Sequence, residues 1–143
     1  MYRLLSLAPE AKSIRSHSMT QSSGLLQLFL EKGLTHDCNH FIPEHAGFDL
    51  KPWLLWNGLI KVPYFWEDDT SCIYMQKTKM LELVNKNGIK VFGFHPIHVF
   101  LNTENLEHYE RTRPLHHNPH ERIKHRHAGQ GTRARLMELL KYA

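Results

Sequence analysis

The chain has 143 residues, 41% of them hydrophobic and 22% charged, with a formal net charge of +4 and a pI of about 9.1. These values are typical of a single soluble globular domain, and the mild basic charge gives no reason to expect a nucleic-acid partner. No apolar run reaches the ~18 residues of a membrane-spanning helix and the two cysteines form no CxxC pair, so we expect a cytoplasmic protein with free thiols.

The predicted elements alternate between short strands and helices. Strands are predicted at residues 12–18, 34–43, 59–66 and 89–96, and helices at 22–33 and 74–88. The segment 45–58, which is marked by glycine and proline, is predicted to be a loop. Alternation of this kind predicts parallel strands joined by right-handed crossovers, and therefore an α/β fold.

Beyond Asn102 the sequence predicts a short helix capped by Thr103 and a final amphipathic helix capped by Thr132. Between them, residues 114–131 are rich in histidine and arginine and are expected to form a flexible loop. A tract this rich in histidine would bind metal ions without forming a structured site. The spacing of the histidines, without cysteines, matches no zinc-finger pattern. The basic residues are not interleaved with aromatic side chains, so we expect no nucleic-acid interface.

Ionisable residues follow each of the four predicted strands. They are Arg15 and His17, His36 and Asp37, Glu67 to Asp69, and His95 and His98. Sites in α/β folds form at the carboxyl ends of parallel strands, so we expect these groups to meet at one edge. Arg15 and His17, at i and i+2 of a strand, share a face and could hold a carboxylate or a metal. The alternative is a solvated charged turn.

The run 91–102 is almost wholly apolar apart from His95 and His98. The two histidines are either core residues bonded to backbone carbonyls or side chains that the strand delivers into a site. Pro96 turns the chain out of the strand and therefore places His95 at its tip. At i and i+3 the two rings could also touch one metal.

The run WEDD at 66–69 has two readings as well. Asp68 and Asp69 are either a solvated acidic turn or carboxylates beneath an aromatic platform for a sugar. Tyr64 and Trp66 would form that platform, although aromatic runs are more often part of a core.

Four stretches together resemble a known family: residues 9–43, 59–69, 91–110 and 131–140. Within them RSHS, PYFWEDD and FHPIHVFLN, in this order, resemble the polysaccharide deacetylase-like proteins of the WbmS type. The resemblance implies a partial distorted (β/α) barrel with parallel strands and flanking helices. It also implies a bacterial enzyme that removes acetyl groups from a sugar or polysaccharide with a divalent metal, most often zinc.

The resemblance also implies roles for individual residues. By position His95 is the general acid, Asp68 and Asp69 support it, and Arg15 orients the catalytic base. His17 stands where the wider superfamily has proline and could be an added metal ligand or a substrate contact. The expected substrate contacts are Trp66, Tyr64 and His98.

Two motifs of the family have no counterpart in this sequence: the early strand with the base and the metal-binding aspartate, and the histidine motif with further ligands. We therefore expect a single domain over 1–143 that is truncated at its N-terminus and lacks part of its zinc ligands. The expected function is a metal-dependent sugar deacetylase. The alternative is a non-catalytic metal- or carbohydrate-binding remnant of such an enzyme.

Overall fold

The computed structural model describes residues 2–77 and 79–142, so Met1, Thr78 and Ala143 lie outside it. The α-helices are α1 (Tyr2–Leu7), α2 (Ser23–Glu31), α3 (Asp68–Ile73), α4 (Met80–Val84), α5 (Pro96–Leu101), α6 (Leu106–Thr112), α7 (Pro119–Arg122) and α8 (Thr132–Leu139). The 3-10 helices are η1 (His17–Met19), η2 (Glu44–Ala46), η3 (Arg113–Leu115) and η4 (Ile123–His125). The strands are β1 (Ser13–Ile14), β2 (His36–Asp37), β3 (Trp53–Leu54), β4 (Ile60–Lys61), β5 (Trp66–Glu67) and β6 (Phe92–Gly93).

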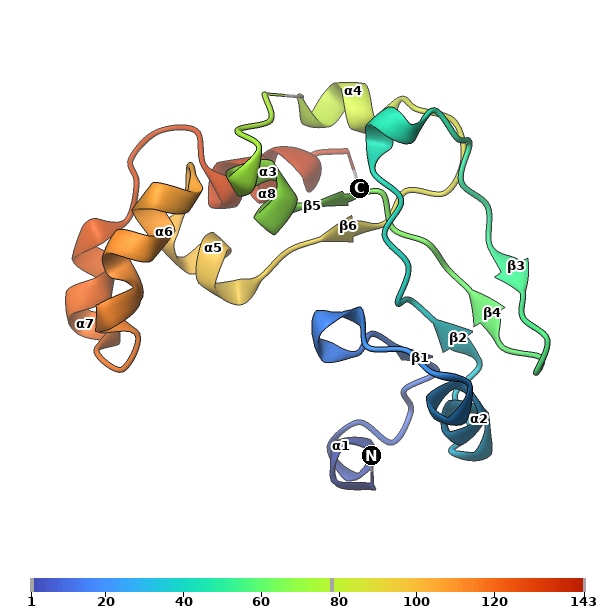
Figure 1. The fold of residues 1–143 in the computed structure, drawn as a ribbon. Helices are drawn as coiled ribbons and strands as arrows, with labels where there is room; N and C mark the ends of the chain where they lie inside the picture. Colours follow the sequence, from blue (N-terminus) through green and yellow to red (C-terminus); the bar gives the residue numbers. More distant parts are fainter. Residues whose placement is uncertain (1, 78, 143) are drawn as a thin grey trace.

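The strands form two short sheets. In the first, with the order β1-β2-β4-β3, the strands β1, β2 and β4 are parallel and β3 is antiparallel to β4. The second pairs β5 with β6 in parallel. Figure 1 shows the elements following an open arc, and the described residues close no barrel. The predicted α/β fold with parallel strands is confirmed, while its being part of a barrel stays a prediction.

The predicted strand 59–66 is divided into β4 and β5 because Pro63 has no N–H to donate to a neighbouring strand. The chain nevertheless stays extended across this point. Tyr64 forms a parallel bridge with Phe41, and the N–H of Phe65 donates to the carbonyl of Val91 at 3.3 Å. The segment therefore pairs with β2 at its start and with β6 at its end, and it joins the two sheets.

Several predicted boundaries are wrong. Asn105 and Gly131, and not Thr103 and Thr132, are the N-cap residues of α6 and α8, and β3 lies inside the segment predicted to be a loop. The acidic run begins α3, because Asp68 and Asp69 in the first turn are favourable at the positive end of the helix dipole. The left-handed backbone of Met75 (φ 49°) follows, and the predicted helix 74–88 shortens to α4. The chain after Pro96 is also helical: as the first residue of α5, proline lacks only an N–H that would have no partner inside the helix.

The histidine-rich segment 114–131 contains short helices, and not only irregular loop as predicted. Asn118 caps α7 by accepting a hydrogen bond from the N–H of Glu121 at 3.2 Å. The ring of His108 on α6 lies with its Nε2 2.7 Å from the carbonyl of His125, which ties the segment to the helix beside it. The mobility of the segment stays a prediction.

Two apolar clusters hold the arc together. One contains Leu50, Phe65, Trp66, Met80 and Leu83, and the other Phe29, Leu34 and Leu59. The first cluster includes Trp66 of β5 and packs against Phe92 of β6, so it fixes the two strands that carry acidic and histidine residues at their ends. No helix among the described residues is long and apolar enough to span a membrane.

We expect Leu83→Ala to lower the free energy of unfolding by about 2–5 kcal/mol, because Leu83 is fully buried in the first cluster. Leu81 on the same helix is 44% exposed, and Leu81→Ala should cost less than about 1 kcal/mol. Urea unfolding of the two variants measures both values. Equal losses would contradict this assignment of the core.

Candidate active site

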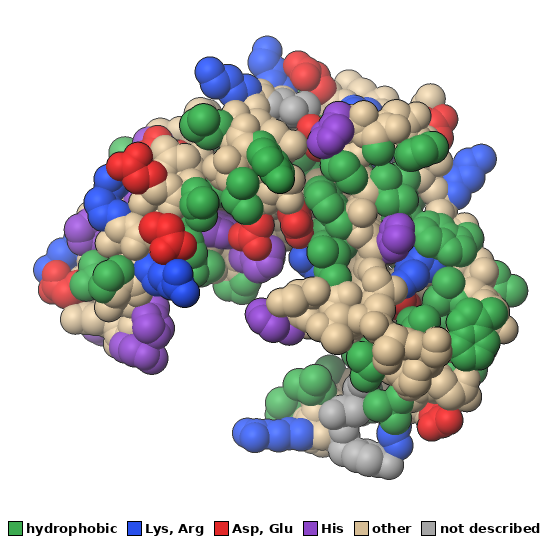
Figure 2. Space-filling view, in the orientation of Figure 1, with side chains coloured by type: hydrophobic (Ala, Val, Ile, Leu, Met, Phe, Trp, Pro, Cys, Tyr) green, Lys and Arg blue, Asp and Glu red, His purple; other side chains and the backbone are tan. Residues whose placement is uncertain are grey.

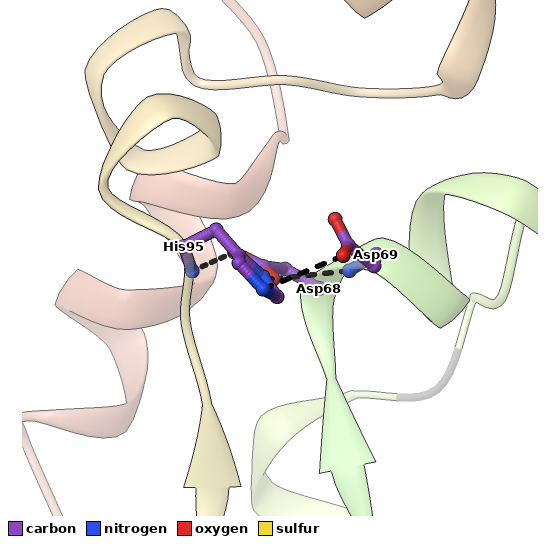
Figure 3. Close-up of side chains that lie close together, drawn as sticks. All are labelled: Asp68, Asp69 and His95. Carbon is purple, nitrogen blue, oxygen red and sulfur yellow. Dashed lines mark hydrogen bonds and ion pairs between the residues drawn. The ribbon is translucent and has the colours of Figure 1, made fainter. Parts of the chain in front are cut away.

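The centre of the site is a buried carboxylate that holds a histidine from the neighbouring strand. Asp68 follows β5 and is fully buried, and His95 follows β6 (Figure 3). The backbone N–H of His95 donates to Oδ2 of Asp68 at 2.8 Å, and the ring Nδ1 lies 2.6 Å from Oδ1. A carboxylate only accepts hydrogen bonds, so Nδ1 carries the hydrogen. The other ring nitrogen, Nε2, is therefore the atom left to act.

This contact changes the acidity of His95. The hydrogen bond with Asp68 is the largest cause raising its pKa, and the charges of Asp68 and Asp69 act in the same direction, against burial and the charge of Arg15. A histidine with a raised pKa retains its proton closer to neutral pH. His95 is therefore suited to donate a proton near neutral pH.

Asp69 faces open space and is held in place by His98. Its Oδ1 accepts a hydrogen bond from Nε2 of His98 at 2.6 Å, and its Oδ2 lies 3.4 Å from Nε2 of His95. The bond with His98 is the main cause that lowers the pKa of Asp69, so Asp69 is ionised at neutral pH. The ring of His98 is buried, and its Nδ1 lies 3.1 Å from the hydroxyl of Thr103. With both nitrogens engaged, His98 positions Asp69 and has no free ring nitrogen for the substrate contact predicted for it.

Arg15 lies on the other side of the site and pairs with Glu67, a residue to which the sequence analysis gave no separate role. Its Nη2 is 3.1 Å from Oε2 of Glu67, and its guanidinium lies 4.4 Å from the centre of the Tyr64 ring. The Tyr64 hydroxyl donates to the same carboxylate oxygen at 3.2 Å. Burial, followed by the charge of Glu67, raises the pKa of Tyr64 to about 12, so the hydroxyl keeps its hydrogen.

Gly93 makes room for this ion pair. A Cβ at this position would lie 2.9 Å from Nη1 of Arg15 and 3.1 Å from Cβ of Glu67. Gly93 was not among the predicted site residues, although a glycine between Phe92 and Phe94 inside a strand is a recognised sign of close approach.

The strand ends surround a cavity of about 430 Å³, and Figure 2 shows the molecule hollowed on this side. Its lining includes Arg15, His17, Tyr64, Glu67, Asp69 and His95. A second cavity of about 290 Å³ lies against α5 and also reaches Asp69, His95 and His98. Three of the four predicted strand ends therefore contribute to one open region.

The fourth strand end, that of β2, turns inward. Asp37 and Lys61 are both buried and form an ion pair between β2 and β4. Asn39 donates to Asp37 at 2.6 Å and accepts from the backbone N–H of Ser16, also at 2.6 Å. This network does not face the cavity. It holds the turn after β1 that presents the arginine and the exposed histidine.

The aromatic residues predicted to form a platform for a sugar are buried, and their contact with a sugar stays a prediction. Trp66 is 1% exposed and packs against Phe92 and Phe94, with ring centroids 6.1 and 5.1 Å apart. The ring of Tyr64 is equally buried, and Arg15 lies over it. Both rings are therefore part of the core, and Tyr64 also lines the cavity.

Asp68, Asp69 and His95 each offer one ligand atom within 4.8 Å of the others, a group that could hold a metal ion. Both oxygens of Asp68, however, already accept hydrogen bonds from His95, and Oδ1 also accepts one from the N–H of Asp69 at 3.0 Å. Asp69 and Nε2 of His95 remain toward the cavity, whereas catalytic zinc has three protein ligands. His17 lines the cavity but is not in the group of three. As arranged, the three residues form an oriented acid, and two of them offer a donor atom toward the cavity.

Parallel strands that carry a carboxylate-supported histidine to the edge of an open cavity define an α/β protein with a candidate acid–base site at its strand ends. The sequence matches the family described as WbmS-like polysaccharide deacetylase over residues 1–113, and the chain belongs to this family. This confirms the resemblance seen in the sequence.

A crystal structure at 1.90 Å from Bordetella bronchiseptica has a closely similar fold, with a TM-score of 0.89 and 42% sequence identity. The description of that protein assigns it to the polysaccharide deacetylases and to O-antigen biosynthesis. The match covers 99% of this chain and 60% of that one, so the chain spans about 60% of its solved relative. Comparison with curated proteins gives no match.

We expect Asp68→Asn to lower the pKa of His95 more than Asp69→Asn does, because the hydrogen bond with Asp68 is the largest cause of the raised value. An NMR titration of the His95 ring measures this pKa. Since the folded pKa is raised, the stability that His95 gains is full below about pH 6.5 and is lost as the pH rises through the folded pKa. An unchanged pKa in Asp68→Asn would contradict the geometry of the pair.

Proposed function

We propose that this chain carries the proton-donating part of a deacetylase that acts on an acetylated sugar or polysaccharide. The observation that carries the proposal is the pair formed by Asp68 and His95, which directs Nε2 of His95 toward the cavity that contains Asp69. Membership of the polysaccharide deacetylase family and the description of the Bordetella protein support this assignment.

The chemistry of amide hydrolysis explains why such a histidine is needed. Water adds to the acetyl carbon, the carbon–nitrogen bond breaks, and the departing nitrogen must take up a proton. Protonated His95 can supply it from Nε2, while Asp68 holds the ring in place and stabilises its positive charge. The ion pair of Arg15 with Glu67 forms the facing wall of the cavity.

The activation of the water is not assigned to a described residue. Zinc, which the family resemblance implies, would need donors beyond Asp69 and Nε2 of His95, so no step is routed through it. Zinc, a cytoplasmic location and a bacterial source stay predictions. The shortage of free donors also favours a second candidate, a sugar-binding protein of this family that does not turn over its ligand.

We expect His95→Ala to reduce acetate release from N-acetylated or O-acetylated sugars by at least about 100-fold, because it removes the proton donor. His120→Ala is the matched control, since His120 is exposed on α7. A wild-type rate in His95→Ala would contradict the proposed role. Sugar binding in calorimetry by a wild-type chain that releases no acetate would support the second candidate.

The pH dependence tests the protonation state of His95. Activity should fall as the pH rises through the raised pKa of His95, because the proton donor is then lost. Asp68→Asn should move this fall to lower pH. A pH profile that Asp68→Asn leaves unmoved would mean that another group donates the proton.

For the metal, we expect the tag-free chain to retain less than one zinc ion after dialysis, with no change in His17→Ala or His95→Ala. The reason is that Asp69 and Nε2 of His95 offer two donors toward the cavity, whereas catalytic zinc has three protein ligands. Elemental analysis of the three proteins measures this. One zinc ion per chain that is lost in both variants would instead show a metal centre built on these histidines.

A further inference from the structure

Arg122, the last residue of α7, carries a charge that no side chain of the described residues neutralises. It is 5% exposed, and its Nε and Nη2 are buried without a hydrogen-bond partner. The acidic residues of α6 and α7 pair elsewhere: Glu107 with Arg111, Glu110 with Arg113, and Glu121 with Lys124. A buried and unpaired guanidinium is costly, because it has lost its water and gained no partner.

A cavity of about 370 Å³ lies against this arginine and is lined by residues of α5 and α7. Its lining is Pro96, Ile97, Phe100, His116, Pro119 and Arg122. Its volume falls within the range of roughly 300–1,000 Å³ that small-molecule pockets occupy. Apolar walls with one charged group that fixes orientation are also the usual composition of such pockets.

The cavity adjoins the candidate active site. Ile97 of α5 lines both this cavity and the cavity that reaches Asp69. The ring of Tyr109 lies between the two regions, with its centroid 5.8 Å from the Arg122 guanidinium and 4.9 Å from the His98 ring centroid. A ligand long enough to extend across α5 would therefore contact both Arg122 and the cavity that reaches Asp69.

We propose that this cavity, the Arg122 pocket, binds the oxyanion of an acidic sugar. A carboxylate or a phosphate would neutralise the guanidinium, and charge-assisted contacts of this kind are stronger than contacts between neutral groups. The apolar walls would receive the C–H faces of the sugar ring. The sugar part of the inference rests on the proposed function, whereas the binding of an anion does not.

Calorimetric titration with glucuronate, glucose 1-phosphate and glucose tests the inference and separates the two sources of the oxyanion. We expect at least one acidic sugar to bind the wild-type chain and glucose to bind much more weakly. Arg122→Met should weaken the binding of that acidic sugar by at least about tenfold. Arg133→Met removes the same charge from an exposed position on α8 and should leave binding unchanged.

Arg122→Met should fold at least as stably as the wild type without ligand, because it removes a buried unpaired charge. If it does not fold, Arg122→Lys provides the comparison, with a compact charge in place of the guanidinium and weakened binding.

The inference would be overturned if glucose bound as well as the acidic sugars, or if the Arg122 variant kept its affinity. It would also be overturned if neither acidic sugar bound at about 100 μM, a concentration ~100 times the Kd of a micromolar ligand. The titration requires no turnover. A failed deacetylase assay together with anion binding that depends on Arg122 would therefore remove the proposed function and leave the pocket.

Discussion

The arrangement of the site depends on one buried carboxylate. Asp68 accepts hydrogen bonds from the backbone and the ring of His95 and from the N–H of Asp69, so its charge is compensated although it is removed from water. These contacts join the end of β5 to the end of β6. They also fix which ring nitrogen of His95 faces the cavity, so one interaction determines both the geometry and the protonation of this half of the site.

The other half of the site, around Arg15, is positioned by a buried ion pair and by a glycine on the neighbouring strand. The buried ion pair of Asp37 with Lys61 reaches the turn after β1 through Asn39, and this turn presents the arginine side chain. The absence of a side chain at Gly93 lets the guanidinium of Arg15 approach β6. A satisfied buried polar network of this kind favours one arrangement of the backbone, since any shift would leave a buried group unpaired.

The two cavities beside α5 suggest how chemistry and recognition are divided. The groups that can exchange protons, His95 and Asp69, lie on one side of the helix, and the unpaired charge of Arg122 lies on the other. An enzyme gains specificity when parts of the substrate remote from the reacting bond are bound. In the proposed arrangement, proton transfer and the recognition of charge are therefore carried out by different residues on either side of this helix.

The sequence by itself determined the α/β alternation, the family and the placement of ionisable residues at strand ends. These follow from local patterns: apolar runs, glycine stops and the proline that places His95 at the tip of its strand. It could not assign different roles to Asp68 and Asp69, because adjacent residues differ only in which one the fold buries. It could not show that Trp66 is covered, or that Arg122 has no partner. Burial and pairing depend on residues distant in the chain, and only the tertiary structure brings these together.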